Sequence, residues 1–149
     1  MRVFRLHRRC RPAADYHGSL IQPNRWNPAG VPMLYCSAAL SLACLEVLVH
    51  LTAEEIPPDY VYSSAELPKP TEDADFQGEL VDADATRRYG HYWVRSRRSL
   101  AILVPSVVIP EERNALLNPL HPDFSEIEWS APRAFRFDRR LLGDRLIYS

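Results

Sequence analysis

The sequence is poor in several residue types, and each shortage argues against a class of protein. Only three cysteines occur among 149 residues, and they form no CxxC pair. This sparse, odd set predicts neither a disulfide framework nor a zinc site, and it is typical of a reducing compartment. The five glycines form neither a GxGxxG nor a Walker A loop, and there is no HExxH. We therefore expect no bound metal.

Long hydrophobic segments are also missing. The apolar run after Ser37 ends near Leu51, which is shorter than the roughly 20 residues that span a bilayer. The basic stretch "MRVFRLHRRCR" is not followed by the apolar run of a signal peptide. We expect a cytoplasmic protein that does not bind a membrane.

Charge of neither sign dominates, because the chain has 18 basic and 19 acidic residues and a formal net charge of -1. That balance predicts no direct nucleic-acid binding. The segment "RRYGHYWVRSRR" does interleave arginines with aromatics, which suits stacking on bases. Its acidic neighbour "EDADFQGELVDAD" instead favours a solvated helix face or a surface for a protein partner.

The chain length suits one domain, residues 1–149, and the 13 prolines predict short elements with long ordered connections. Alternating or β-branched patterns predict strands at 2–6, 31–37, 59–67 and 133–138, and a proline-bent strand pair at 99–110. Helices are predicted from an N-cap at Ser37 to about Leu51, and over 84–96 with a break near Gly90. Residues 8–30 and 68–79 are predicted to be loops. The mixture indicates an α+β fold, a compact single domain with a small split or curved β-sheet and flanking helices.

Glu46 lies in the middle of the most apolar predicted helix. It shares one helical face with Ala39, Ala43 and His50, and the other faces carry leucines and valines. A buried carboxylate without a partner costs several kcal/mol or takes up a proton. Glu46 therefore has a partner, faces a cavity that admits a ligand, or belongs to a face that meets water. His50, at the helix end, fits a structural role better than a catalytic one.

Three further residues have both a functional and a structural interpretation. Arg25 could clamp a phosphate, or it could stack on Trp26 as a surface lid. Tyr35 could stack on a planar ligand, or it could be an ordinary core tyrosine. Ser106 lies in the apolar stretch "LVPSVV" without a GxSxG motif, so a hydrogen bond to nearby backbone is the simpler interpretation.

Three segments together resemble one known family. They are "RWNPAGVPMLYCSAALSLACLEVLVHL", "RRSLAILVPSVVIPEERNALLNPLHPDF" and "FRFDRRL", and the likeness extends over nearly the whole chain. They resemble the RES-domain family, the toxin components of bacterial RES–Xre toxin–antitoxin systems. The order and spacing of arginine, tyrosine, glutamate and serine agree together.

The resemblance implies site residues and an activity. Glu46, Arg25 and Ser106 would be catalytic, and Arg25, Tyr35 and Ser106 would bind substrate. The family loop usually has two glycines before the arginine, where this chain has Pro23 and Asn24. The implied fold is similar to that of ADP-ribosyltransferase toxins.

The implied substrate is NAD, whose nicotinamide–ribose bond is cleaved with water or inorganic phosphate as acceptor. No cofactor is implied. The implied partner is an Xre-type antitoxin that blocks the active site, and a homodimer within the complex stays open. Two alternatives also stay open: a protein ADP-ribosyltransferase, and a catalytically silent domain that only binds NAD or a partner.

Overall fold

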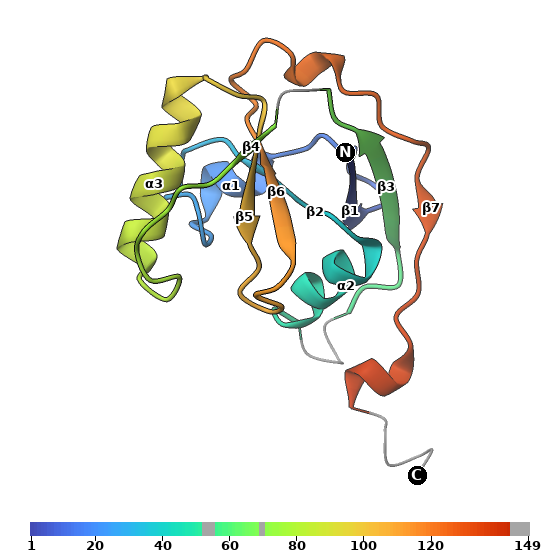
Figure 1. Ribbon diagram of the computed structural model, residues 1–149. Helices are drawn as coiled ribbons and strands as arrows, with labels where there is room; N and C mark the ends of the chain where they lie inside the picture. Colours follow the sequence, from blue (N-terminus) through green and yellow to red (C-terminus); the bar gives the residue numbers. More distant parts are fainter. Residues whose placement is uncertain (52–55, 69–70, 144–149) are drawn as a thin grey trace.

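The computed structural model describes residues 1–51, 56–68 and 71–143 (Figure 1). Its elements confirm the predicted α+β class. In chain order they are β1 (Arg2–Arg8), α1 (His17–Ile21), β2 (Leu34–Ser37), α2 (Leu40–Leu48), β3 (Tyr60–Glu66), β4 (Glu72–Asp73), α3 (Ala83–Ser96), β5 (Ala101–Pro105), β6 (Arg113–Leu117), the 3₁₀ turn η2 (Phe124–Glu126), β7 (Arg133–Ala134) and the 3₁₀ turn η3 (Arg139–Leu142).

The strands form one sheet that is nearly divided in two. Its order is β4-β5-β6-β2-β1-β3-β7, and only the β4–β5 pair is parallel. β1 pairs with β3 along its whole length, but it meets β2 only at Phe4 and Ser37. Figure 1 shows the two groups of strands diverging from this joint. The predicted split sheet is therefore present as two half-sheets that share one residue pair.

An apolar cluster packs on each face of the sheet, as strand geometry requires. Successive side chains of a strand point to opposite faces. In β5, Ala101 joins one cluster, whereas Ile102 and Val104 join the other. The second cluster is covered by α3, which contributes the fully buried Trp93 and Val94. This second face also carries the candidate functional site.

The helix around Glu46 is shorter than predicted and only partly buried. It begins at Leu40 after an N-cap at Ala39 that makes no side-chain hydrogen bond, and it ends at Leu48. Ser37 is not the cap, because it is the last residue of β2. The helix is also only partly buried: Leu42, Ala43 and Cys44 are buried, and Val49 directly beyond its end is 57% exposed.

Several other predicted boundaries are wrong. The loop predicted at 8–30 contains α1, and the one at 68–79 contains β4. The predicted strand pair at 99–110 is one strand, β5, followed by turns, and its antiparallel neighbour β6 was not predicted. The segment at 133–138 supplies only the two residues of β7, which do lie at the edge of the sheet. No helix in the described parts of the chain is long and apolar enough to cross a membrane.

The second predicted helix has no break near Gly90, and this glycine has a packing role instead. Helix α3 runs continuously through it from Ala83 to Ser96. A Cβ atom built on Gly90 would lie 1.7 Å from the carbonyl oxygen of Trp26. Glycine therefore allows the helix to touch the backbone of the loop that carries Arg25.

Helix α3 ends at a residue with a strained backbone conformation, and relieving this strain should stabilise the protein. Arg97 is the C-cap, with a φ of 53° in the left-handed region that glycine adopts most easily. We expect Arg97→Gly to raise the free energy of unfolding by up to about 1 kcal/mol, because the strain relieved exceeds the extra entropy of the unfolded chain. Denaturant titration would measure this, with Arg95→Gly, inside the helix, as a control that should be less stable than wild type. Equal losses for both variants would contradict the expectation.

Candidate functional site

Glu46 has polar partners from two distant strand ends. Its Oε1 atom accepts hydrogen bonds from the hydroxyl of Ser106 at 2.7 Å and from the side-chain amide of Asn114 at 2.8 Å. Glu46 is half-buried. Within the described residues, its other oxygen, Oε2, accepts no hydrogen bond. One carboxylate oxygen is thus fixed by the fold, and the other is free to accept further hydrogen bonds.

Ser106 is the residue that directly follows β5, and it is fully buried. Its hydroxyl donates to Glu46 and accepts from the backbone amides of Val108 and Ile109, each at 3.0 Å. The structural interpretation of Ser106 is therefore confirmed, because its hydroxyl bonds to nearby backbone, and the same hydroxyl also contacts the candidate carboxylate. The backbone bonds fix the oxygen, so the hydroxyl proton points at Glu46.

Two members of the site were missed from the sequence. Asn114, on β6, donates to Glu46 and accepts from the hydroxyl of Ser37 at 2.7 Å. These two residues face each other across the β2–β6 pair. The only hint of Asn114 in the sequence is a polar residue directly before the apolar "ALL". Ser37 was predicted to be a helix N-cap and not a member of the site. Both residues are positioned to orient Glu46.

Tyr35 lies two residues before Ser37, so its side chain projects from the same face of β2, about 6.6 Å along the strand. Its hydroxyl donates to Asn27 Oδ1 at 2.6 Å and accepts from the backbone amide of Trp26 at 3.1 Å. Burial raises the pKa of the phenol, while nearby Arg87 and Arg25 oppose the rise. The hydroxyl stays protonated, and the half-buried ring is held in one orientation.

Arg25 lies in a tight loop beside Tyr35. The loop is closed by a backbone bridge between Asn24 and Asn27, and Arg87 of α3 donates to the carbonyl of Asn24 at 2.9 Å. The half-buried guanidinium of Arg25 donates from Nη1 to the carbonyl of Leu80 at 2.7 Å. This bond uses one of its donors, so the rest of the fork can bind a ligand.

Trp26 does not form a surface lid with Arg25. It is only 2% exposed, and its ring packs edge-on against Phe76 and Tyr89 with centroid distances of 5.3 and 5.9 Å. The alternative of an Arg–Trp surface stack is therefore wrong. Trp26 instead anchors the Arg25 loop in the cluster beneath α3.

The four residues singled out by the sequence thus form two pairs. Glu46 and Ser106 are in direct contact, and Arg25 lies close enough to Tyr35 to affect the pKa of its phenol. The stretch from Tyr35 to Ser37 connects the pairs along one face of β2. His50 lies beyond the end of α2 and is exposed. The described residues contain no group of three or more potential metal ligands.

The comparison with family models identifies the chain. A model described as the RES domain matches residues 2–139. The chain belongs to the RES domain family. A protein of Sphingobium sp. (strain YBL2) named Prs ADP-ribosylating toxin is 37% identical over 142 residues, covering 84% of each chain. A protein of Photorhabdus laumondii named Toxin Res is 31% identical over 134 residues, covering 84% of this chain and 85% of its own.

A solved structure shows the same fold. A chain of the M.tuberculosis MbcT-MbcA toxin-antitoxin complex superposes with a TM-score of 0.64 at 14% identity, covering 90% of this chain and 83% of its own. The RES fold of this chain is therefore the α+β fold seen in that complex.

Proposed function

We propose that this RES domain protein is the toxin of a toxin–antitoxin system and that it consumes NAD by cleaving the nicotinamide–ribose bond. The observation that carries the proposal is the contact of Glu46 with Ser106 and Asn114. The names of its relatives and of the complex with the same fold support the toxin role.

The proposed chemistry needs one fixed negative charge. When the bond between the ribose C1′ and the nicotinamide nitrogen breaks, its electron pair leaves with the now neutral nicotinamide. The ribose becomes an oxocarbenium-like cation, which a nearby carboxylate stabilises. Ser106 and Asn114 would hold Oε1 of Glu46 in place, so that Oε2 faces the ribose or binds one of its hydroxyls. An oxygen of water or of inorganic phosphate then bonds to C1′ and loses a proton. Ser106 acts here as a positioning residue.

Arg25 and Tyr35 are proposed to bind the substrate. The remaining guanidinium donors of Arg25 suit the diphosphate of NAD, and the fixed ring of Tyr35 suits stacking on nicotinamide. Both groups are anchored to one loop and strand, so little entropy would be lost when NAD binds.

Loss of Arg25 is expected to weaken substrate binding more than it slows the reaction. Arg25→Ala should raise KM for NAD by about 10- to 100-fold, the range for a charge-assisted hydrogen bond, with a smaller change in kcat. Arg25→Lys should recover only part of the loss, since lysine lacks the planar fork. Steady-state kinetics with nicotinamide release as the readout would measure both parameters. An unchanged KM for NAD in the alanine variant would show that Arg25 does not bind the substrate.

The cellular role can be tested by expression in a bacterium. The chain alone should arrest growth and lower cellular NAD, and co-expression with its cognate antitoxin, which we propose to be of the Xre type, should restore both. The antitoxin would block the site, and a carboxylate in its blocking segment would pair with Arg25. Normal growth with normal NAD when the chain is expressed alone would favour a catalytically silent binding domain instead.

A second candidate activity is the transfer of ADP-ribose to a protein. It is favoured by the name of the 37% identical relative, Prs ADP-ribosylating toxin. The same bond of NAD would break, but a nucleophile of the target protein would replace water or phosphate. Incubation with NAD labelled in its adenylate part distinguishes the two. Label that stays on protein supports transfer, whereas label that appears only in small products supports NAD consumption.

A further inference from the structure

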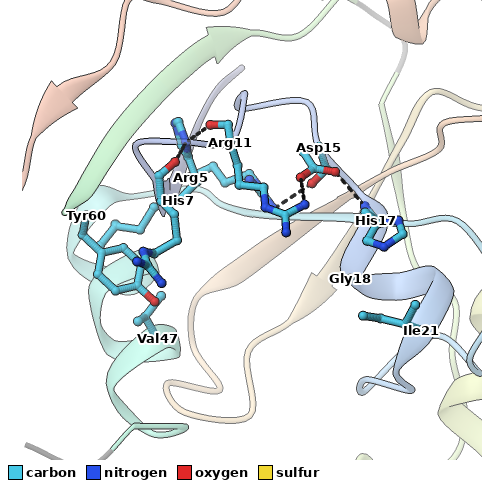
Figure 2. Close-up of a pocket in the computed structure, with 11 residues that line it drawn as sticks. Arg5, His7, Arg11, Asp15, His17, Gly18, Ile21, Val47 and Tyr60 are labelled. Carbon is cyan, nitrogen blue, oxygen red and sulfur yellow. Dashed lines mark hydrogen bonds and ion pairs between the residues drawn. The ribbon is translucent and has the colours of Figure 1, made fainter. Parts of the chain in front are cut away.

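The loop of residues 74–82, which connects β4 with α3, carries the backbone carbonyl that holds Arg25, and the proposed function gives this loop no role. The carbonyl belongs to Leu80 and accepts a hydrogen bond from Arg25 Nη1 at 2.7 Å. A hollow of about 280 Å³ beside β1, which Figure 2 shows between Tyr60 and His17, shares no residue with the loop. The loop is therefore a separate feature, and it reaches the candidate site through Leu80.

Tyr89 of α3 holds the first part of this loop against the helix (Figure 1). Its hydroxyl donates to Asp75 Oδ1 at 2.6 Å and accepts from the backbone amide of Asp75 at 3.1 Å. The hydrogen bond from Tyr89 lowers the pKa of Asp75, and burial raises the pKa of Tyr89. At neutral pH the carboxyl group is therefore ionised and the phenol protonated, which is the pairing that a charge-assisted hydrogen bond needs. One hydroxyl thus fixes both the side chain and the backbone of Asp75.

Three aromatic rings connect the 74–82 loop with the loop that carries Arg25. Phe76 packs edge-on against Tyr89 and Trp26, with centroid distances of 5.5 and 5.3 Å. Tyr89 and Trp26 also pack against each other, at 5.9 Å. Trp26 directly follows Arg25 in the chain and is only 2% exposed. Arg25 is therefore held at both ends, its backbone by the burial of Trp26 and its guanidinium by Leu80.

The middle of the 74–82 loop is exposed and adds little packing of its own. The exposed residues that separate Phe76 from Leu80 are Gln77, Gly78 and Glu79. An arginine side chain that moves freely loses conformational entropy when it binds a ligand. A carbonyl 2.7 Å from the guanidinium reduces this cost before binding, but only while the loop that carries the carbonyl is itself fixed.

We propose that Tyr89 is a positioning residue for substrate binding, which it supports without touching the substrate. By bonding to Asp75, Tyr89 fixes the 74–82 loop against α3. The carbonyl of Leu80 then keeps Arg25 oriented for the diphosphate of the ligand. The identity of that ligand rests on the proposed function.

The first test removes the hydroxyl of Tyr89 and keeps its ring. ADP-ribose carries the diphosphate but not the bond that is cleaved, so calorimetric titration measures binding alone. Tyr89→Phe should lower the affinity for ADP-ribose by about 3- to 10-fold, the usual effect of one hydrogen bond. The matched control is Tyr92→Phe, because Tyr92 is 68% exposed on the same helix and makes no hydrogen bond within the described residues. Wild-type affinity in Tyr89→Phe would overturn the inference, as would wild-type protein that does not bind ADP-ribose.

The loop side of the contact gives an independent variant. Asp75→Ala removes the same pair of side chains from contact and should cause the same loss of affinity. Asp75→Asn keeps an oxygen that can accept from Tyr89, so it should recover most of the loss. The double variant Tyr89→Phe/Asp75→Ala should bind no more weakly than either single variant, because two residues that act as one unit do not have additive effects. Additive losses would overturn the inference.

A third comparison distinguishes positioning of Arg25 from a general loss of stability. In an Arg25→Ala background, Tyr89→Phe should no longer change the affinity for ADP-ribose, because the group that it positions is gone. An equal loss of affinity with and without Arg25 would show that the hydroxyl does not act through Arg25, and it would overturn the inference.

Steady-state kinetics separates this inference from the proposed function. Tyr89→Phe should raise KM for NAD by the same factor and leave kcat close to wild type, the pattern of lost binding without lost chemistry. A lower kcat with an unchanged KM would overturn the inference. Wild-type protein that binds ADP-ribose in a Tyr89-dependent way, but releases no nicotinamide from NAD, would leave this inference standing while the proposed function fails.

Discussion

Glu46→Gln is expected to lower the rate of NAD cleavage by about 10²–10³-fold, the usual cost of one catalytic electrostatic contact, while the protein stays folded. Glutamine keeps a carbonyl oxygen that can accept the hydrogen bonds now made by Ser106 and Asn114. What it loses is the charge opposite the developing ribose cation. The measurement is nicotinamide release at saturating NAD, together with thermal unfolding of both proteins.

A matched control for this variant is Glu111→Gln, which removes the charge of an exposed glutamate in the turn after β5. Its turnover should equal that of wild type. Wild-type turnover in Glu46→Gln would rule out an electrostatic role for this carboxylate. Unfolding of Glu46→Gln would instead show that the charge itself holds α2 to the strand ends.

Gly90→Ala is expected to destabilise the protein by about 1–3 kcal/mol, although alanine favours a helix by about 1 kcal/mol over glycine. The sign of the change in stability distinguishes the gain in helix propensity from the steric clash. We expect the clash to dominate, because the added Cβ atom would lie 1.7 Å from the carbonyl oxygen of Trp26. Helix α3 or the loop must move, and the loop carries Arg25. We therefore expect a raised KM for NAD together with the loss of stability.

The control for Gly90→Ala is His91→Ala, at the next and exposed position of α3. It should leave both stability and KM close to wild type, which denaturant titration and steady-state kinetics would measure. A Gly90→Ala protein that is more stable than wild type would mean that α3 and the Arg25 loop are not in close contact.

The parts of the fold that depend on local pattern were predicted well. β1 and β3 were both predicted to be strands, and they pair along seven residues. The odd position of Glu46 was also visible locally, because a charge stands out in an apolar helix. The break predicted at Gly90 shows the limit of such arguments: glycine disfavours a helix locally, but here a contact with Trp26, distant in the sequence, explains it.

The parts that depend on distant pairing could not be predicted. β6 reads "RNALL", which has no β-branched residue, and it is a strand because β5 and β2 pair with it on both sides. Asn114 was missed with it. Ser37 before an apolar run has the pattern of a helix cap, but its pairing with Asn114 extends β2 through it. Knowledge of the sheet order was needed to see that the two residues meet.

The partners of Glu46 also determine when during synthesis the site can assemble. Ser106 and Asn114 lie 60 and 68 residues after it in the chain. At the usual elongation rate of about 5–20 residues per second, Asn114 is added roughly 3–14 s after Glu46. Throughout that interval the nascent chain carries the carboxylate without the groups that orient it. A ribosome that stalls in this interval would therefore release a fragment lacking part of the site, and the order of the residues along the chain delays the assembled site until most of the protein has been made.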